Sequence, residues 1–181
     1  YRWLFKQAIF RKNADEKKVY LTFDDGPHPE ATPFVLNVLE SHGIKATFFV
    51  LGKNVKKHPE LFQQLKESGH AIGNHGMSHL NGWTTSTDTY VHDAETGKAI
   101  SESNLFRPAY GKMTLSQYTK LMQTEKIVFW DVISGDFDAK SNPKKVVKNV
   151  LNHTRNGSII VMHDSKKAMN NLFGSMNEII T

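Results

Sequence analysis

The 181-residue sequence predicts an α/β fold in which parallel strands are joined by helical crossovers, and three observations support this class. Six short apolar runs alternate along the chain with segments that have the pattern of helices. Polar clusters follow nearly every run at its carboxyl end, which is the edge that carries the active site in a parallel α/β barrel. The length and a hydrophobic fraction of 39% are typical of one globular domain with its own core.

The expected strands are runs rich in apolar, β-branched or aromatic residues. They span residues 18–21, 46–51, 71–72, 105–106, 127–132 and 158–162. The run 46–51 shows no alternation of apolar and polar residues, as expected for a strand that is covered on both faces.

Helices are expected between these strands. Thr32 can cap the first helix with Pro33 at its first position, and Gly43 ends this helix. Pro59 begins a second helix, which Gly69 ends. Four more helices are expected at residues 90–101, 116–124, 143–151 and about 167–180.

The first 17 residues combine an amphipathic patch with a charged run. We expect residues 1–17 to be a lead-in segment whose apolar side docks on a single domain of residues 18–181. The chain opens abruptly at Tyr1, as a piece trimmed from a longer protein would.

Composition narrows the possible functions. The net charge is +5, but the lysines are scattered and no long basic block appears, so nucleic-acid binding is poorly supported. A mildly basic surface also suits an anionic polymer such as bacterial cell wall. The chain has no cysteine, so any metal must be held by His, Asp or Glu. No apolar run is long enough for a membrane span, and no signal peptide is visible.

Two adjacent carboxylates, Asp24 and Asp25, lie where the first strand meets a Gly-Pro turn. Inside a strand the two would point to opposite faces, but at a strand end both can converge on one point. Two like charges that close repel each other unless a cation lies between them. The alternative is a solvated turn, since Asp, Gly and Pro are common turn residues. This stretch alone leaves the two interpretations even.

The spacing of His75 and His79 lets two imidazoles face one cation from a helical turn. Such a pair is more often a coincidence on a surface helix, but Gly76 disfavours a plain surface helix. With one carboxylate from Asp24 or Asp25, the set suits zinc or another divalent first-row metal. Spacing leaves open which carboxylate binds the metal and which acts as a base.

Further strand ends carry candidate polar groups. His163 is a candidate proton donor, although on this residue alone a structural histidine closing a buried strand is the favoured interpretation. Arg107 could orient a carboxylate, and the backbone around Tyr110 and Gly111 could donate to an oxyanion. The alternative for this stretch is an Arg-Pro turn with a surface ion pair.

Aromatic side chains near these clusters could bind a sugar ring. Trp83, Tyr110 and Phe137 could form an apolar platform, whereas Trp130 lies within an expected strand and is assigned to the core. The other histidines are assigned to surface or structural roles: His28, His42, His58, His70, His92 and His153.

Four motifs, taken in order, resemble those of the polysaccharide deacetylase family, the NodB-homology group of carbohydrate esterases. They are Thr22-Phe23-Asp24-Asp25-Gly26-Pro27, His75-x-x-Ser78-His79, Arg107-Pro108-Ala109-Tyr110-Gly111 and Ile160-Val161-Met162-His163. The match runs from about residue 19 to residue 164. Each motif alone is weak, but four in the right order leave little room for coincidence.

This resemblance implies a distorted (β/α) barrel of about six to seven parallel strands with outer helices. It implies that residues 18–181 are a catalytic domain that removes acetyl groups from N-acetylated sugar polymers of the peptidoglycan or chitin type. The cofactor would be a divalent metal, most often zinc, with cobalt or nickel as alternatives. The expected partner is an acetylated glycan, the expected location is extracytoplasmic or at the cell envelope, and we expect a monomer.

The resemblance also implies roles for individual residues. Carried over by position, Asp25, His75 and His79 would bind the metal. Asp24 would be the general base that takes a proton from water, and Arg107 would hold Asp24 in place.

The remaining roles concern the leaving group and the oxyanion. The backbone N–H of Tyr110 would complete the oxyanion hole, His163 would protonate the departing amine, and Asp136 would tune His163. The family pattern Asp-x-x-Asp-Trp is altered here, with Ile133 at the first acid and Phe137 at the tryptophan. This departure bears on substrate preference more than on catalysis. The chain also stops soon after its last motif, so we expect the barrel to close differently or to be incomplete.

Two other functions are compatible with these residues. One is a glycan-binding protein that keeps the metal site without turnover. The other is an amidase for a small non-sugar amide, in which the loop bearing Trp83 would close over a compact pocket.

Overall fold

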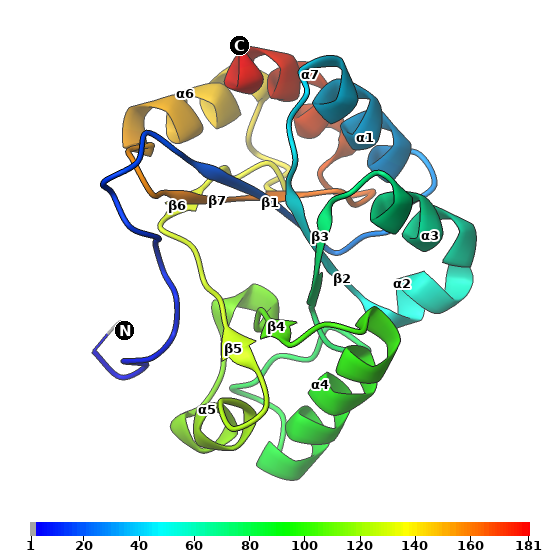
Figure 1. The fold of residues 1–181 in the computed structure, drawn as a ribbon, viewed down its shortest axis with the longest axis vertical. Coiled ribbons are helices and arrows are strands. Elements are labelled where there is room, and N and C mark those ends of the chain that lie inside the picture. The colour runs from blue at the N-terminus through cyan, green and yellow to red at the C-terminus, as the bar shows by residue number, and fades with distance from the viewer. Residues whose placement is uncertain (1–2) are drawn as a thin grey trace.

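Seven parallel strands form one curled sheet in the computed structural model, which describes residues 3–181 (Figure 1). The strands are β1 (Tyr20–Asp24), β2 (Thr47–Val50), β3 (Ala71–Asn74), β4 (Leu105–Phe106), β5 (Lys126–Ile127), β6 (Val132–Ile133) and β7 (Ile159–His163). Their order across the sheet is β5-β4-β3-β2-β1-β7-β6. The expected distorted (β/α) barrel of about six to seven parallel strands is confirmed, as a half-barrel with helices around it.

Seven α-helices surround the strands (Figure 1). They are α1 (Ala31–Ser41), α2 (Gly52–Lys57), α3 (Pro59–Glu67), α4 (Thr87–Ser101), α5 (Leu115–Leu121), α6 (Pro143–His153) and α7 (Met169–Ile180), with a 3₁₀ turn, η1, at Ala109–Gly111. Helix α2 was not expected, because six mostly polar residues carry no apolar periodicity. Between residues 3 and 181, no helix combines the length and the apolar character needed to cross a membrane.

The expected single strand at 127–132 is wrong, because this segment bridges the two edges of the sheet. Its start pairs with β4 and its end pairs with β7, so β5 and β6 form with different neighbours. Between them, Val128 donates its N–H to Phe106 and Asp131 donates its N–H to Ile159. One run of chain thus links the open sides of the half-barrel.

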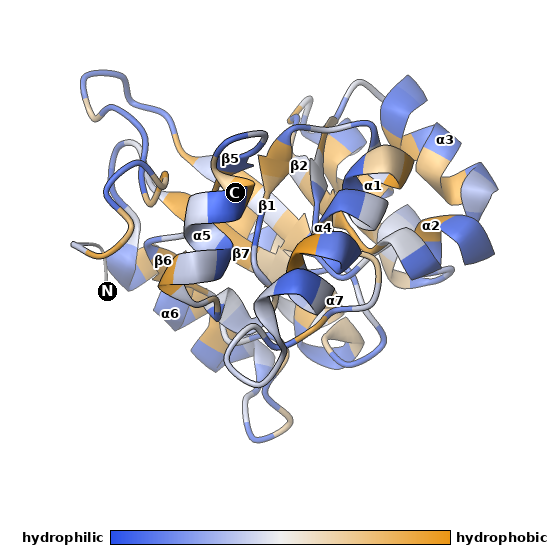
Figure 2. Ribbon diagram, turned by 90° about the horizontal axis from the view of Figure 1, so that it is seen from below, coloured by the Kyte–Doolittle hydropathy of each residue, from blue (hydrophilic) through white to orange (hydrophobic). Residues whose placement is uncertain are grey.

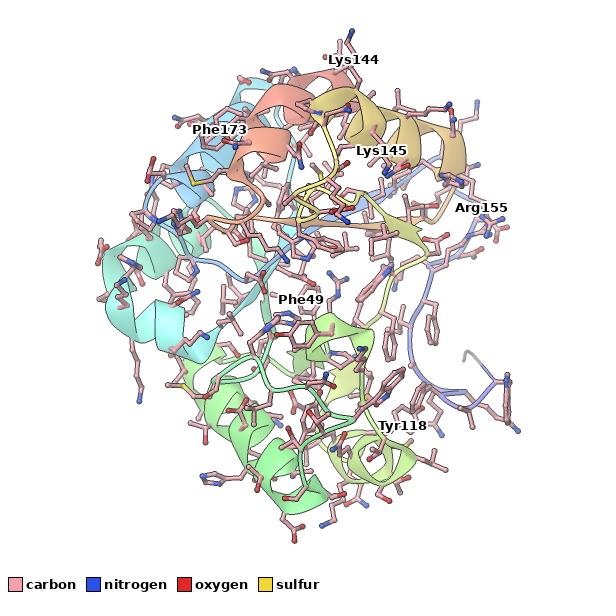
Figure 3. The ribbon with its side chains drawn as sticks, turned by 180° about the vertical axis from the view of Figure 1, so that it is seen from behind. Phe49, Tyr118, Lys144, Lys145, Arg155 and Phe173 are labelled. Atoms are coloured by element: carbon pink, nitrogen blue, oxygen red, sulfur yellow. The ribbon has the colours of Figure 1, made fainter. Side chains whose placement is uncertain are left out.

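The lead-in segment packs against this bridging run. Phe5 is 2% exposed and contacts the ring edge of Tyr118, which Figure 3 labels on α5. The N–H of Ile9 donates to the carbonyl of Ile127 at 2.8 Å, and Phe129 donates back to Ile9 at 2.8 Å. Residues 1–2 of the expected segment lie outside the described residues.

Hydrophobic residues are concentrated on the strands and on the helical faces turned towards them, while the outer helical faces are largely hydrophilic (Figure 2). The main core cluster includes Phe23, Val35, Leu39, Phe48, Leu65, Ile160, Met162, Leu172 and Met176. Burial of this apolar surface is the principal stabilising contribution to such a domain. It holds the strand ends, and the polar side chains that follow them, in fixed positions.

Thr32 does not cap the first helix, contrary to expectation. Helix α1 begins at Ala31, and the hydroxyl of Thr32 instead donates to the carboxylate of Asp164 at 2.5 Å. The hydroxyl oxygen of Thr32 also accepts the N–H of His28 at 2.8 Å. The end of the helix is as expected, because Gly43 follows it with a φ of +63°.

Candidate active site

The polar residues singled out from the sequence meet at one edge of the sheet. The parallel pairing of β1 and β7 places Asp24 directly opposite His163. His75 follows β3 and Arg107 follows β4, and both of these strands end at the same edge. Parallel strands joined by helices must present their carboxyl ends together, which explains the convergence.

Asp25, His75 and His79 form a group that can hold a metal ion. Their ligand atoms all lie within 4.8 Å of one another. Oδ1 of Asp25 lies 3.1 Å from Nε2 of His79 and 3.6 Å from Nε2 of His75. This buried oxygen nevertheless accepts no hydrogen bond of acceptable geometry, so it is left available as a ligand.

The orientation of His75 also suits metal binding. Its Nδ1 lies 2.8 Å from the carbonyl oxygen of Arg107, so the proton belongs on Nδ1. The lone pair of Nε2 is then directed at Asp25 and His79. Two imidazoles and one carboxylate are a donor set suited to a divalent first-row metal.

The two histidines do not share a helical turn, contrary to the expectation from their spacing. They lie in the loop after β3, where His79 has a left-handed φ of 64°. The side chain of Asn74 accepts the N–H of Gly76 at 2.8 Å, and that of Asp93 accepts the N–H of Met77 at 2.9 Å. These bonds turn the loop back on itself and bring His79 over the strand ends.

Arg107 is fully buried and binds Asp24. Its Nη1 lies 2.7 Å from Oδ1 of Asp24 and 2.7 Å from the hydroxyl of Thr22. The other guanidinium N–H groups donate to two backbone carbonyls of the segment 126–133. The guanidinium stacks 4.0 Å from the ring of Phe49, which Figure 3 labels in the interior. The alternative of an Arg-Pro turn with a surface ion pair is therefore wrong.

The geometry separates the two adjacent carboxylates. Asp25 belongs to the three-residue group, whereas Asp24 is fixed through one oxygen by Arg107. The other oxygen of Asp24 lies 3.9 Å from Nε2 of His75, so it faces the same group from the side. Asp25 has a left-handed φ of 81°, which turns its side chain away from the direction of the strand.

His163 forms a second buried pair, with Asp136. Its Nδ1 lies 2.7 Å from Oδ1 of Asp136, and its backbone N–H donates to Oδ2 at 2.7 Å. Burial favours the neutral ring, but the negative charges and hydrogen bond of Asp136, with Asp24 and Asp25 nearby, raise the pKa of His163 to about 9. The ring is therefore protonated at neutral pH.

Exposed aromatic rings stand beside these groups. The ring of Tyr110 lies 4.4 Å from that of His79, and the side chains of Tyr110 and Trp83 are 59% and 58% exposed. The ring of Phe137 lies 5.0 Å from that of His163. Trp130 was expected in a strand of the core, but it is half-buried and lies between β5 and β6.

Asp164 is a functional candidate that the sequence reasoning missed. It is fully buried, and its carboxylate accepts the N–H of Gly26 at 3.1 Å and the hydroxyl of Thr32 at 2.5 Å. A Cβ atom on Gly26 would lie 2.0 Å from this carboxylate, so the contact requires glycine. Burial raises the pKa of Asp164 to about 8. The sequence feature that could have identified Asp164 was its position directly after His163, at the end of the same expected strand.

The fold and these residues define a parallel α/β half-barrel whose carboxyl edge carries three side chains that could hold a metal ion, with the Asp24–Arg107 and His163–Asp136 pairs beside them. A family model described as polysaccharide deacetylase matches residues 11–125. The chain belongs to the polysaccharide deacetylase family.

Relatives of known name agree with this assignment. The chain is 34% identical to a peptidoglycan-N-acetylglucosamine deacetylase of Bacillus cereus over 91% of its own length and 62% of the relative. It is 31% identical to a chitooligosaccharide deacetylase of Azorhizobium caulinodans over 85% of its length and 77% of the relative. The crystal structure of the Bc1960 peptidoglycan N-acetylglucosamine deacetylase superposes with a TM-score of 0.88 at 30% identity, covering 98% of this chain and 87% of that one.

Proposed function

We propose that this chain is a metal-dependent hydrolase that removes acetyl groups from N-acetylated sugar polymers of the peptidoglycan or chitin type. The observation that carries the proposal is that the Asp25, His75 and His79 group lies beside the buried carboxylate of Asp24, which itself lies opposite His163 on the neighbouring strand. The names of the relatives supply the substrate class.

Asp25, His75 and His79 would hold the divalent metal, for which zinc is the best match to the donor set. When bound, the metal supplies a Lewis acid for the acetyl carbonyl and lowers the pKa of a coordinated water. Asp24 is the general base, because its second oxygen faces the group and Arg107 keeps the carboxylate oriented.

His163 is the general acid. Its protonated ring donates to the departing amine nitrogen, and Asp136 holds the ring in place while raising its pKa. The backbone N–H of Tyr110 donates to the oxyanion. Tyr110 lies in the 3₁₀ turn η1, and its ring contacts that of His79. All these groups come from one chain, which supports the expectation that a monomer suffices.

Acetate release tests this proposal. Purified protein is incubated with N-acetylglucosamine oligomers and with peptidoglycan, before and after treatment with a chelator, and then with zinc or cobalt restored. We expect release that stops after chelation and returns with the metal. Asp24→Asn should abolish release, while the exposed Asp88→Asn serves as the matched control. Well-metallated, folded protein that releases no acetate from any acetylated glycan would refute the proposal.

The two alternatives receive less support. A binding protein without turnover has no need for the Asp24 and His163 arrangements that are present here. An amidase for a small substrate was expected to close the Trp83 loop over a compact pocket, but the Trp83 side chain is 58% exposed. Glycan binding to the Asp24→Asn variant without any turnover by the unmodified protein would favour the first alternative.

A further inference from the structure

Three lysines from three separate segments stand around the candidate active site: Lys53 in α2, and Lys112 and Lys167 in loops. Lys53 follows the end of β2, Lys112 follows η1 after β4, and Lys167 follows β7. All three therefore lie at the carboxyl edge of the sheet, where the candidate site residues meet. We call these three side chains the lysine rim.

Two members of the lysine rim contact the loop that carries His79. Nζ of Lys53 donates to the carbonyl of Ser78 at 3.4 Å, one residue before His79. Nζ of Lys112 lies 4.8 Å from the ring centroid of Trp83, within the range of a cation–π contact. Both ammonium groups thereby contact the segment that follows β3 and carries His79.

The third member of the rim, Lys167, lies near His163, the proposed general acid. Nζ of Lys167 is 5.5 Å from the ring centroid of Phe137. The ring of Phe137 contacts that of His163 at 5.0 Å. A positive charge thus stands next to the aromatic ring that a sugar would approach beside His163.

Within residues 3–181, no carboxylate forms an ion pair with a member of the lysine rim. The lysines that form ion pairs among residues 3–181 are Lys18, Lys66 and Lys120, and none of these belongs to the rim.

Two carboxylates of neighbouring segments, those of Asp93 and Asp138, bind backbone N–H groups instead of the rim. That of Asp93 accepts the N–H groups of Met77 and Ser78, and that of Asp138 accepts the N–H of Lys140. The rim therefore carries positive charge that a ligand can use.

We propose that the lysine rim makes this chain select acetylated glycans that carry carboxylates over neutral acetylated glycans. The ammonium groups beside Trp83 and Phe137 attract a carboxylate on a neighbouring sugar or on its substituent, and the net charge of +5 adds long-range attraction. A neutral polymer gains nothing from these charges. The inference rests on the proposed deacetylase function and narrows its substrate class.

A matched pair of substrates tests the selectivity. Peptidoglycan strands are compared with the same strands after their carboxylates have been converted to amides, so that only charge differs. At low salt we expect kcat/KM to be about tenfold higher on the charged strands than on the amidated strands, which is the lower end of the rate enhancement that electrostatic attraction produces. The kcat/KM on the charged strands should fall as salt is added. Equal kcat/KM values on the two substrates, without salt dependence, would overturn the inference.

Two triple variants locate the effect. Changing Lys53, Lys112 and Lys167 to Gln should bring the ratio of kcat/KM values close to one. The control changes Lys17, Lys45 and Lys126 to Gln, which removes the same net charge from exposed positions before or at the start of strands, at the opposite edge of the sheet. The control variant should keep the kcat/KM ratio of the unmodified protein. An equal fall of this ratio in both variants would contradict a role for the rim.

Failure of the proposed function can be told apart from failure of this inference. If neither substrate releases acetate, the hydrolase proposal is wrong. Calorimetric binding of the charged and amidated strands to the unmodified protein then still decides the selectivity. Tighter binding of the charged strands would uphold the role of the rim, and equal binding would exclude it.

Discussion

Nη1 of Arg107 lies 2.7 Å from Oδ1 of Asp24, and the two residues are only 0% and 2% exposed. The pair joins the ends of β4 and β1, which are 83 residues apart in sequence. Burying a charged side chain without a partner is costly, and the guanidinium of Arg107 provides the partner for Asp24. Remaining N–H groups of Arg107 bind backbone carbonyls, so the cation is itself satisfied.

Breaking this pair should destabilise the protein strongly. Arg107→Met leaves the carboxylate of Asp24 buried without a partner, and we expect the free energy of unfolding to fall by about 3–5 kcal/mol. Urea denaturation measures it. The double variant Arg107→Met with Asp24→Asn should lose less than the sum of the single losses, because neither charge is then left alone. Additive losses would show that the two side chains do not stabilise each other.

The pH dependence of activity should follow His163. Its protonated form is needed to donate a proton, so kcat/KM should fall as the pH rises through about 9. Asp136→Asn removes the main charge that raises this pKa, and the fall should move to lower pH. The control Asp138→Asn should leave the profile unchanged, because Asp138 makes no contact with His163 among the described contacts. An unshifted profile in Asp136→Asn would exclude His163 as the acid.

The same pair links stability to pH. The pKa of His163 is raised from 6.5 to about 9 in the folded protein, so the folded state binds the proton more tightly than the unfolded state. The resulting stabilisation is complete below about pH 6.5, the ordinary histidine pKa, and is lost as the pH rises through 9. Denaturation midpoints from pH 6 to 10 measure this, and His163→Gln should flatten that dependence.

Removing the carboxylate of Asp164 should loosen the turn that presents Asp25. Asp164→Ala leaves the N–H of Gly26 and the hydroxyl of Thr32 without their acceptor, which should cost about 1–3 kcal/mol for each unsatisfied group. We also expect about tenfold weaker zinc binding, as for other residues that orient ligands. Zinc content after equilibrium dialysis separates the two effects. A loss of stability with unchanged zinc affinity would limit Asp164 to a structural role.

Metal affinity should depend on His79 and on pH. His79→Ala removes one of the three ligands and should abolish stoichiometric zinc binding, whereas His92→Ala on the exposed face of α4 should not. Zinc binding should weaken as the pH falls, because protons compete with the metal for its ligands. Isothermal titration calorimetry at several pH values measures both effects. Retention of zinc by His79→Ala would show that a different set of residues binds the metal.

Much of the fold was predictable because its signals are local. The alternation of apolar runs with helical periods predicted the parallel α/β class, and Gly43 and Gly69 marked the ends of helices as expected. The order of motifs along the chain placed Asp24, Asp25, His75, Arg107 and His163 at strand ends. These features depend on side-chain chemistry within a few residues, which can be read without knowing what lies across the core.

Only the tertiary structure shows the different surroundings of these residues. Three contacts join segments that are distant in sequence. Arg107 binds Asp24, residues 126–133 link the two edges of the sheet, and the carboxylate of Asp164 accepts the N–H of Gly26. The adjacent Asp24 and Asp25 look equivalent along the chain. They differ in the folded protein because Arg107 reaches one and the two histidines surround the other. A carboxylate's environment is set by neighbours in space, and sequence spacing does not specify them.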